Sequence, residues 1–106
     1  MIQYGSDRVL ELKFAQFKPR LERRNSHWIE IELKFELSPA TPAPPELTDL
    51  SALVICTSEG IIAQIVPLDE GCDCEFQFTA DEKEQMRAFI QSEAIQQAIA
   101  ELPLAE

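Results

Sequence analysis

The 106-residue chain has few of the residues on which common functional motifs depend. Its three glycines, Gly5, Gly60 and Gly71, lie far apart, so neither a phosphate-binding Walker loop nor a dinucleotide fingerprint can be written. The single histidine, His27, stands in none of the patterns that are typical of hydrolases or zinc proteases. These shortages exclude the nucleotide-binding motifs and leave little basis for catalysis.

Long apolar runs and a leader segment are also missing from this sequence. The first residues, MIQYGSDRVLELKF, lack both the basic and the apolar part of a secretory signal, and no apolar run approaches the length of a membrane span. Three cysteines are an odd number and too few for a disulfide framework. We therefore expect a cytoplasmic protein with no membrane partner, no disulfides and no cofactor.

Basic residues are scarce in the second part of the chain. Residues 1–37 hold seven Lys or Arg against six acids, whereas residues 38–106 hold two against thirteen, within a net charge of −10. Such a surface repels a phosphate backbone, so direct nucleic-acid binding is not expected. The segment KPRLERR is a candidate basic contact patch, and its alternative is a solvated hairpin tip. The patch consists of Lys18, Arg20, Arg23 and Arg24.

The sequence does contain clear strand periodicity. Residues 27–37, HWIEIELKFEL, alternate apolar and charged side chains, and RVLELKFAQF at 8–17 repeats the alternation over a shorter length. The two segments predict an antiparallel β-hairpin within residues 1–37. Residues 38–49 hold four prolines and predict an extended connection, with a proline-rich recognition motif as the alternative.

Two apolar segments follow the proline-rich connection, at residues 52–56 and 61–66. Because both faces of each segment are apolar, they predict central strands that are covered on both sides. Alternation then returns, and it places Cys72 and Cys74 on the same face as two phenylalanines. We therefore predict a β-meander over residues 50–78, with both thiols in the core.

The last segment carries helix signals. Thr79 and Glu82 form a capping box, and Pro103 ends the helical pattern. Two apolar stripes lie on nearly opposite sides of this pattern, so one straight helix over residues 79–102 cannot bury both. Either the helix breaks near Ser92, or the second stripe faces another molecule as a candidate protein interface. That stripe consists of Ile95, Ala98, Ile99 and Leu102.

A metal or redox site would have to combine the cysteines with the histidine. The possible ligands are Cys56, Cys72, Cys74 and His27. C-x-C is not a zinc knuckle, and the Cα atoms of two such cysteines on one strand lie about 7 Å apart. The acids within residues 69–75 do not follow the spacing of a calcium-binding loop. We therefore expect no metal ligands and no catalytic residues.

These patterns together predict one α+β domain over residues 1–106. It has an antiparallel meander sheet of about five strands, and a C-terminal helix, whole or broken near Ser92, packs on one face. The expected function is that of a small acidic, non-enzymatic protein-binding or regulatory module, which contacts a protein partner or a second copy in a homodimer. The first alternative is an acidic inhibitor that occupies the basic site of a nucleic-acid-binding protein. The second is a small metal-binding or catalytic protein.

Overall fold

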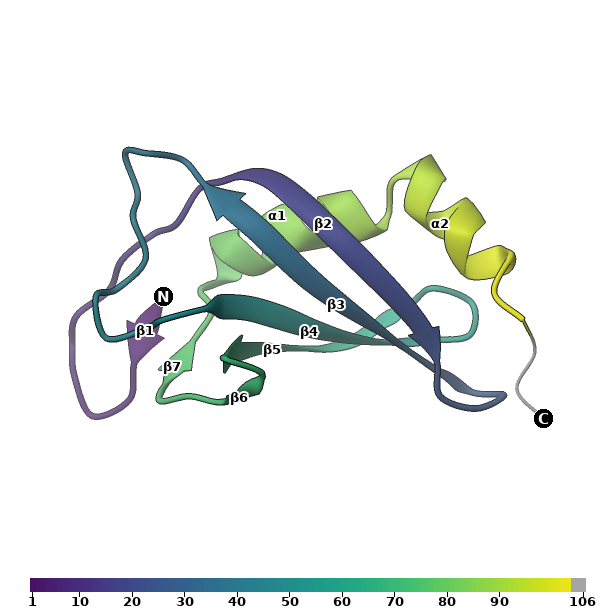
Figure 1. Cartoon of the computed structure of the whole chain (residues 1–106), viewed down its shortest axis with the longest axis horizontal. Coiled ribbons are helices and arrows are strands. Elements are labelled where there is room, and N and C mark those ends of the chain that lie inside the picture. The colour runs from purple at the N-terminus through teal and green to yellow at the C-terminus, as the bar shows by residue number, and fades with distance from the viewer. Residues whose placement is uncertain (104–106) are drawn as a thin grey trace.

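The structure, a computed structural model, describes residues 1–103. It contains a five-stranded antiparallel sheet, a separate two-stranded sheet and two C-terminal helices (Figure 1). The predicted α+β class with a five-stranded meander is thereby confirmed. The end of the predicted domain, residues 104–106, lies outside the described residues.

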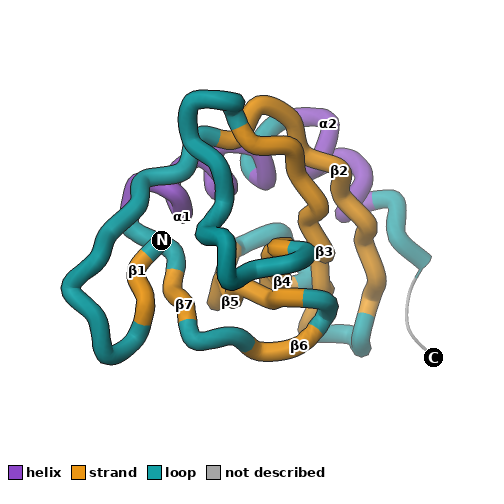
Figure 2. Tube along the Cα trace, turned by 60° about the vertical axis from the view of Figure 1, so that its left-hand side comes forward, coloured by secondary structure: helices purple, strands orange, loops and turns teal. Residues whose placement is uncertain are grey.

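The five strands of the larger sheet lie in the order in which they occur along the chain. The elements are β1 (Ile2–Gln3), β2 (Phe14–Arg23), β3 (Trp28–Leu37), β4 (Leu50–Thr57), β5 (Ile62–Asp69), β6 (Cys72–Asp73), β7 (Phe76–Gln77), α1 (Ala80–Ile90) and α2 (Glu93–Ala100). The larger sheet has the order β2-β3-β4-β5-β6, and all its neighbouring strands are antiparallel. Beside it, β1 pairs with β7 near the N-terminus (Figure 2).

The predicted N-terminal hairpin is present, but its first strand lies later in the chain than predicted. β2 runs from Phe14 to Arg23, whereas the pattern predicted a strand over 8–17. Before Phe14 the chain is irregular, because the Leu12 N–H donates to the buried Glu82 carboxylate (2.8 Å) and not to a neighbouring strand. The predicted bounds were therefore wrong, while the antiparallel pairing with β3 is confirmed.

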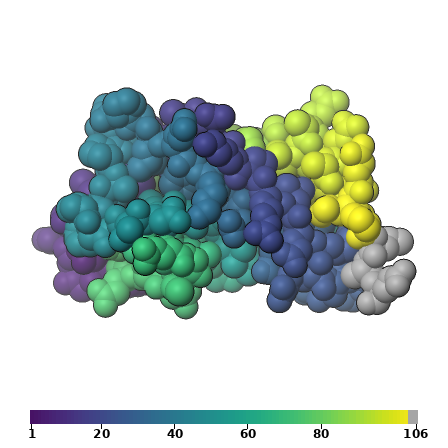
Figure 3. All heavy atoms as spheres, in the orientation of Figure 1, coloured from purple at the N-terminus to yellow at the C-terminus, as the bar shows by residue number. Residues whose placement is uncertain are grey.

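One hydrophobic core contains side chains from the sheet and from both helices. Alternate residues of β3 and β4 point into it, as the period of a strand requires. Its buried sheet members are Ile29, Ile31, Leu33, Ala52, Val54 and Cys56, and its buried helix members are Met86, Ile90, Ile95 and Ile99. Toward the β2 edge, the ring centroids of Phe17 and Phe89 lie 4.8 Å apart. The strands face the reader in Figure 3, where little of α1 is visible.

The helical segment breaks next to Ser92, as the two apolar stripes allowed. α1 begins with the predicted capping box, in which the Thr79 hydroxyl accepts the Glu82 N–H (3.2 Å) and the Glu82 carboxylate accepts the Thr79 N–H (2.8 Å). Ser92 stands at the N-cap position of α2, without a side-chain hydrogen bond there. The break changes the direction of the chain, so that both apolar stripes reach the core.

Glu82 is a charged residue with no exposure to solvent. Its Oε2 accepts hydrogen bonds from the Leu12 N–H (2.8 Å) and from the Met1 ammonium (2.5 Å), while Oε1 accepts from Thr79. A buried carboxylate requires such partners, because its removal from water costs several kcal/mol. These bonds fix the start of α1 against the segment that leads into β2.

The strand predicted from residue 72 onward is divided between the two sheets. A turn at Glu70 (φ +53°) and Gly71 (φ +80°) directs β6 back along β5, but β6 pairs only with Leu68 and Asp69. The chain then leaves the larger sheet, and β7 pairs with β1.

The division of this strand changes the surroundings of both cysteines. The prediction that both thiols lie in the core is wrong for Cys72, which is exposed at the sheet edge, whereas Cys74 is half-buried and packs against the core. Phe76 and Phe78, which were predicted to share that face, are buried.

Candidate functional site

The predicted apolar interface on the last helix is not a free surface. Ile95 and Ile99 are 7% and 2% exposed and belong to the core, and Leu102 packs against it. Ala98 is half-buried. The premise that this stripe has no place in the core was therefore wrong, because the bend at Ser92 turns it inward. Because the stripe is buried in the core, it no longer supports the expected homodimer.

The four residues of the predicted basic patch do not form one surface. Lys18, Arg20 and Arg23 lie in β2 and Arg24 follows it, so the alternative of a solvated hairpin tip is wrong in its location, although Lys18, Arg20 and Arg24 are exposed. The register places Lys18 and Arg20 on the outer face of the sheet, whereas Arg23 lies opposite the buried Ile29 on the inner face. Lys18 and Arg24 form ion pairs with glutamates of β3 (3.6 and 3.1 Å). Neighbouring acids thus already neutralise part of the patch.

The cysteines and the histidine lie in different surroundings. His27 is exposed in the turn between β2 and β3, and Cys56 is buried in β4. Within residues 1–103, no group of three or more His, Cys, Asp or Glu is placed to hold a metal ion. Burial raises the pKa of the Cys56 thiol and of the Cys74 thiol, and nearby aspartates raise the latter further. A raised pKa lowers the thiolate population, which is the form that reacts and binds metal.

The feature that the sequence patterns did not predict is the free edge of β5. The apolar segment at 61–66 predicted a central strand, but β6 covers β5 only at Leu68 and Asp69. In the described part of the chain, no strand pairs with the outer side of residues 62–67. The prediction of a covered central strand was therefore wrong. Pro67 is the signal that favoured an edge, because proline within a sheet is confined to edges and bulges.

The backbone of β5 presents hydrogen-bonding groups to this open side. Pro67 lies opposite Ala52 of β4, and its carbonyl oxygen accepts a bond from the Cys74 thiol (3.8 Å) on the outer side. In an antiparallel ladder, residues that bond to one neighbour alternate with residues that face the other way. Ile65, two residues before Pro67 and opposite Val54, therefore also directs its N–H and C=O outward.

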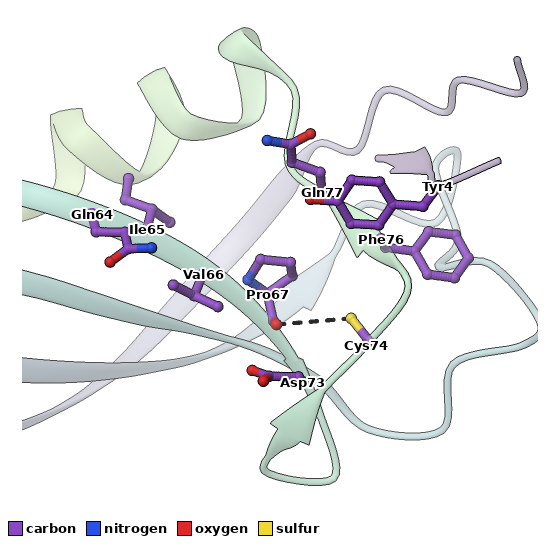
Figure 4. Close-up of a pocket in the computed structure, with 9 residues that line it drawn as sticks. All are labelled: Tyr4, Gln64, Ile65, Val66, Pro67, Asp73, Cys74, Phe76 and Gln77. Carbon is purple, nitrogen blue, oxygen red and sulfur yellow. Dashed lines mark hydrogen bonds between the residues drawn. The ribbon is translucent and has the colours of Figure 1, made fainter. Parts of the chain in front are cut away.

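A groove runs along the open side of β5. Its first part, of about 320 Å³, is lined by Tyr4, Gln64, Ile65, Val66, Pro67, Asp73, Cys74, Phe76 and Gln77 (Figure 4). Its second part, of about 280 Å³, is lined by Ile62, Ala63, Gln64, Ile65, Gln77, Lys83 and Arg87. The two parts share Gln64, Ile65 and Gln77, so they adjoin. We name the whole the β5 groove.

The two ends of the β5 groove differ in charge. Near Ile62 it is lined by Lys83 and Arg87 of α1, which are the only basic residues of the sequence after residue 37. Arg87 Nε lies 3.5 Å from a carboxylate oxygen of Glu84, whereas Lys83 forms no ion pair with any residue from 1 to 103. At the other end, Asp73 is the charged residue of the lining. The groove is therefore basic at one end and acidic at the other.

Comparison with known proteins gives no match. No family model matches the chain, and neither a curated protein nor a solved structure shows significant similarity to it. Of the helices in residues 1–103, neither has the length and apolar character needed to cross a bilayer. The chemistry of the β5 groove must therefore be interpreted from its own residues.

Proposed function

We propose that this protein is a non-enzymatic protein-binding module that takes an extended segment of a partner protein as an added strand along β5. The observation that carries the proposal is the open edge, where Ile65 directs a main-chain donor and acceptor into the β5 groove. Sheet edges bind extended peptides in this way. Main-chain hydrogen bonds supply affinity, and pockets for alternate side chains supply specificity.

The shape of the β5 groove favours a single extended segment over a second folded copy. Tyr4 and Gln77 stand across the groove from β5, as Figure 4 shows. A second copy that paired through its own β5 would bring its own Tyr4 and Gln77 into the same space. From Ile62 to Pro67 the groove is roughly 16 Å long at about 3.3 Å per residue, which suits about five residues of an extended chain.

The other hypotheses have less support in the geometry. The acidic inhibitor was inferred from the excess of acids in residues 38–106, and the outer face of the β2–β3 hairpin does not extend that acidic surface, because it carries both signs. Its acids are Glu22, Glu30, Glu32 and Glu36, and its bases are Lys18, Arg20 and Lys34. A metal site would require several ligands together, and residues 1–103 hold no such group, while burial raises the pKa of the Cys56 and Cys74 thiols and so disfavours their reactive thiolate form.

The substitution Ile65→Pro tests the proposal. It removes the outward N–H and leaves the hydrogen bonds between β4 and β5 in place, as Pro67 already does at the next outward position. Ile65→Ala is the matched control, because it also removes a partly buried apolar side chain but keeps the N–H. The probe is a displayed library of random decapeptides, selected on the wild-type protein.

We expect the selected peptides to bind the Ile65→Pro protein about tenfold more weakly than the Ile65→Ala protein, since one main-chain bond is lost at a cost of roughly 1.4 kcal/mol. Calorimetry with purified peptides measures both affinities, and circular dichroism confirms that both variants are folded. Equal affinities for the two variants would contradict the proposal. So would a selection that enriches no peptide on the wild-type protein.

A further inference from the structure

We infer that the segment bound in the β5 groove carries an acidic side chain at the end that is lined by Lys83 and Arg87. The inference rests on the proposed function and names the chemistry of the partner. The two basic residues are four positions apart on α1, so they stand on the same side of the helix, and both line the groove beside Ile62 and Ala63. A strand added along β5 passes between them and the sheet edge.

Lys83 and Arg87 lie together in a part of the chain that is otherwise acidic. Residues 38–106 hold two basic residues against thirteen acids, and both basic residues line the same part of one groove. Lys83 is half-buried, so a bound strand would remove more of the water around its ammonium group. An ammonium without water or a counter-charge is unfavourable, and a carboxylate on the bound strand would supply that counter-charge. A basic side chain at this position would instead add repulsion.

The net charge of the protein does not reverse this preference. The charge of −10 repels an acidic partner at long range, but salt limits that repulsion to about 8 Å at physiological ionic strength. Contacts within the groove are shorter than this distance, so they decide the local preference. The pair between Arg87 and Glu84 has side chains that are 49% and 70% exposed, and such pairs contribute little stability. Arg87 can therefore exchange Glu84 for a carboxylate of the partner.

The test is a charge reversal on the wall of the groove. The variant is Lys83→Glu with Arg87→Glu, and the matched control is Lys18→Glu with Arg20→Glu, which changes the net charge equally on the opposite edge of the sheet. Random decapeptides are selected on the wild-type protein and on both double variants. Affinities are then measured by calorimetry at low and high salt, and Ile65→Pro identifies the peptides that depend on β5.

We expect Asp or Glu to be enriched in peptides selected on the wild-type protein and on the control, and Lys or Arg in those selected on the groove variant. A wild-type acidic peptide should bind the groove variant about tenfold more weakly at low salt, and the difference should shrink at high salt. Changing the acid of that peptide to lysine should restore its affinity for the groove variant.

The possible failures are distinguishable. Peptides that need the Ile65 N–H but show no acidic preference would overturn this inference and leave the proposed function standing. The absence of peptides that need the Ile65 N–H would overturn both. Light scattering decides one more case, because a dimer of the wild-type protein that Ile65→Pro abolishes would show that a second copy, and not an acidic segment, occupies the groove.

Discussion

The β2 edge of the five-stranded sheet differs in composition from the part of β5 that β6 leaves uncovered, residues 62–67. β2 carries Lys18, Arg20 and Glu22 on its outer face, and Pro19 lies in its middle. β5 carries no charged residue before Asp69, and its one proline, Pro67, lies near the end that β6 covers. Charges and prolines on an edge strand hinder its pairing with other chains. Charges and a proline thus hinder strand addition along the middle of β2, whereas on β5 only Pro67 does so, and residues 62–66 carry neither charge nor proline.

The edges also differ in their attachment to the first helix. The Phe14 N–H donates to the Gln85 side chain (3.1 Å), which in turn donates to the Leu12 carbonyl (2.9 Å). Lys13 pairs with Asp81 at 2.9 Å. On the other side of the sheet, the β5 groove separates β5 from Lys83 and Arg87 of α1. The β2 edge is thus hydrogen-bonded to α1, whereas a groove lies between β5 and the same helix.

The largest effect on stability is expected from a substitution that weakens the attachment of α1 to the segment before β2. Glu82→Gln removes the buried charge that bonds to Leu12 and Thr79, and we expect the free energy of unfolding to fall by about 3 kcal/mol. Denaturant titration measures the change. Glu84→Gln, at an exposed position of the same helix, is the control. Equal midpoints for the two variants would mean that this carboxylate does not hold the β2 side in place.

The reactivity of the thiols should distinguish the interior of the β5 groove from its surroundings. Cys72 is exposed, whereas burial raises the pKa of the Cys74 thiol, so we expect iodoacetamide to label Cys72 about tenfold faster at neutral pH. Cys56 should react only after unfolding. Mass spectrometry of peptides from timed reactions measures the rates. Labelling of Cys74 at the rate of Cys72 would show that the groove is open to bulk solvent at this point.

Adding a charge to β5 should reduce its pairing with other chains, and removing the proline from β2 should increase the pairing of β2. Gln64→Lys adds a charge to the open edge and should slow aggregation of the agitated protein a few-fold. Pro19→Val removes the proline from β2 and should accelerate aggregation by a similar factor. Light scattering over time records both. Gln16→Lys, on the outer face of β2, controls for the added charge, and an equal effect of the two lysines would refute an edge-specific role.

The smallest effect concerns the exposed pair at the start of β2. A hydrogen bond and the positive charge of Lys13 hold the pKa of the Asp81 carboxyl below its usual range. The stabilisation from this lowered pKa is therefore present above the unfolded value, about 3.9, and is lost as the pH falls through the folded value. Asp81→Asn should lower the denaturation midpoint slightly at pH 7 and leave it unchanged at about pH 2. A difference that persists at the acidic pH would assign the effect to another cause.

The sequence predicted correctly those elements whose formation depends on residues close together in the chain. The alternation in residues 27–37 predicted β3, and Thr79 with Glu82 predicted the start of α1. The break at Ser92 followed from two stripes that one helix could not bury. Each of these outcomes depends on residues that lie within a few positions of one another.

The β5 groove depends on contacts between distant parts of the chain. Its open edge exists because β7 pairs with β1 and not with β5, and β1 has only two residues, too few to show a period. Leu12 ends up next to a buried glutamate for a similar reason, since its partner lies 70 positions away. The apolar character of residues 61–66 is equally compatible with a central strand and with an edge strand beside a groove.

The pairing of Ile2 with Gln77 closes a long loop of the chain. Closing such a loop costs more entropy than forming the β2–β3 hairpin, so we expect the meander to fold first and the β1–β7 sheet last. Tyr4 and Gln77, on the far wall of the β5 groove, belong to the part that forms last. During synthesis, the edge of β5 is therefore exposed before its flanking wall exists, and the β5 groove is complete only when folding ends.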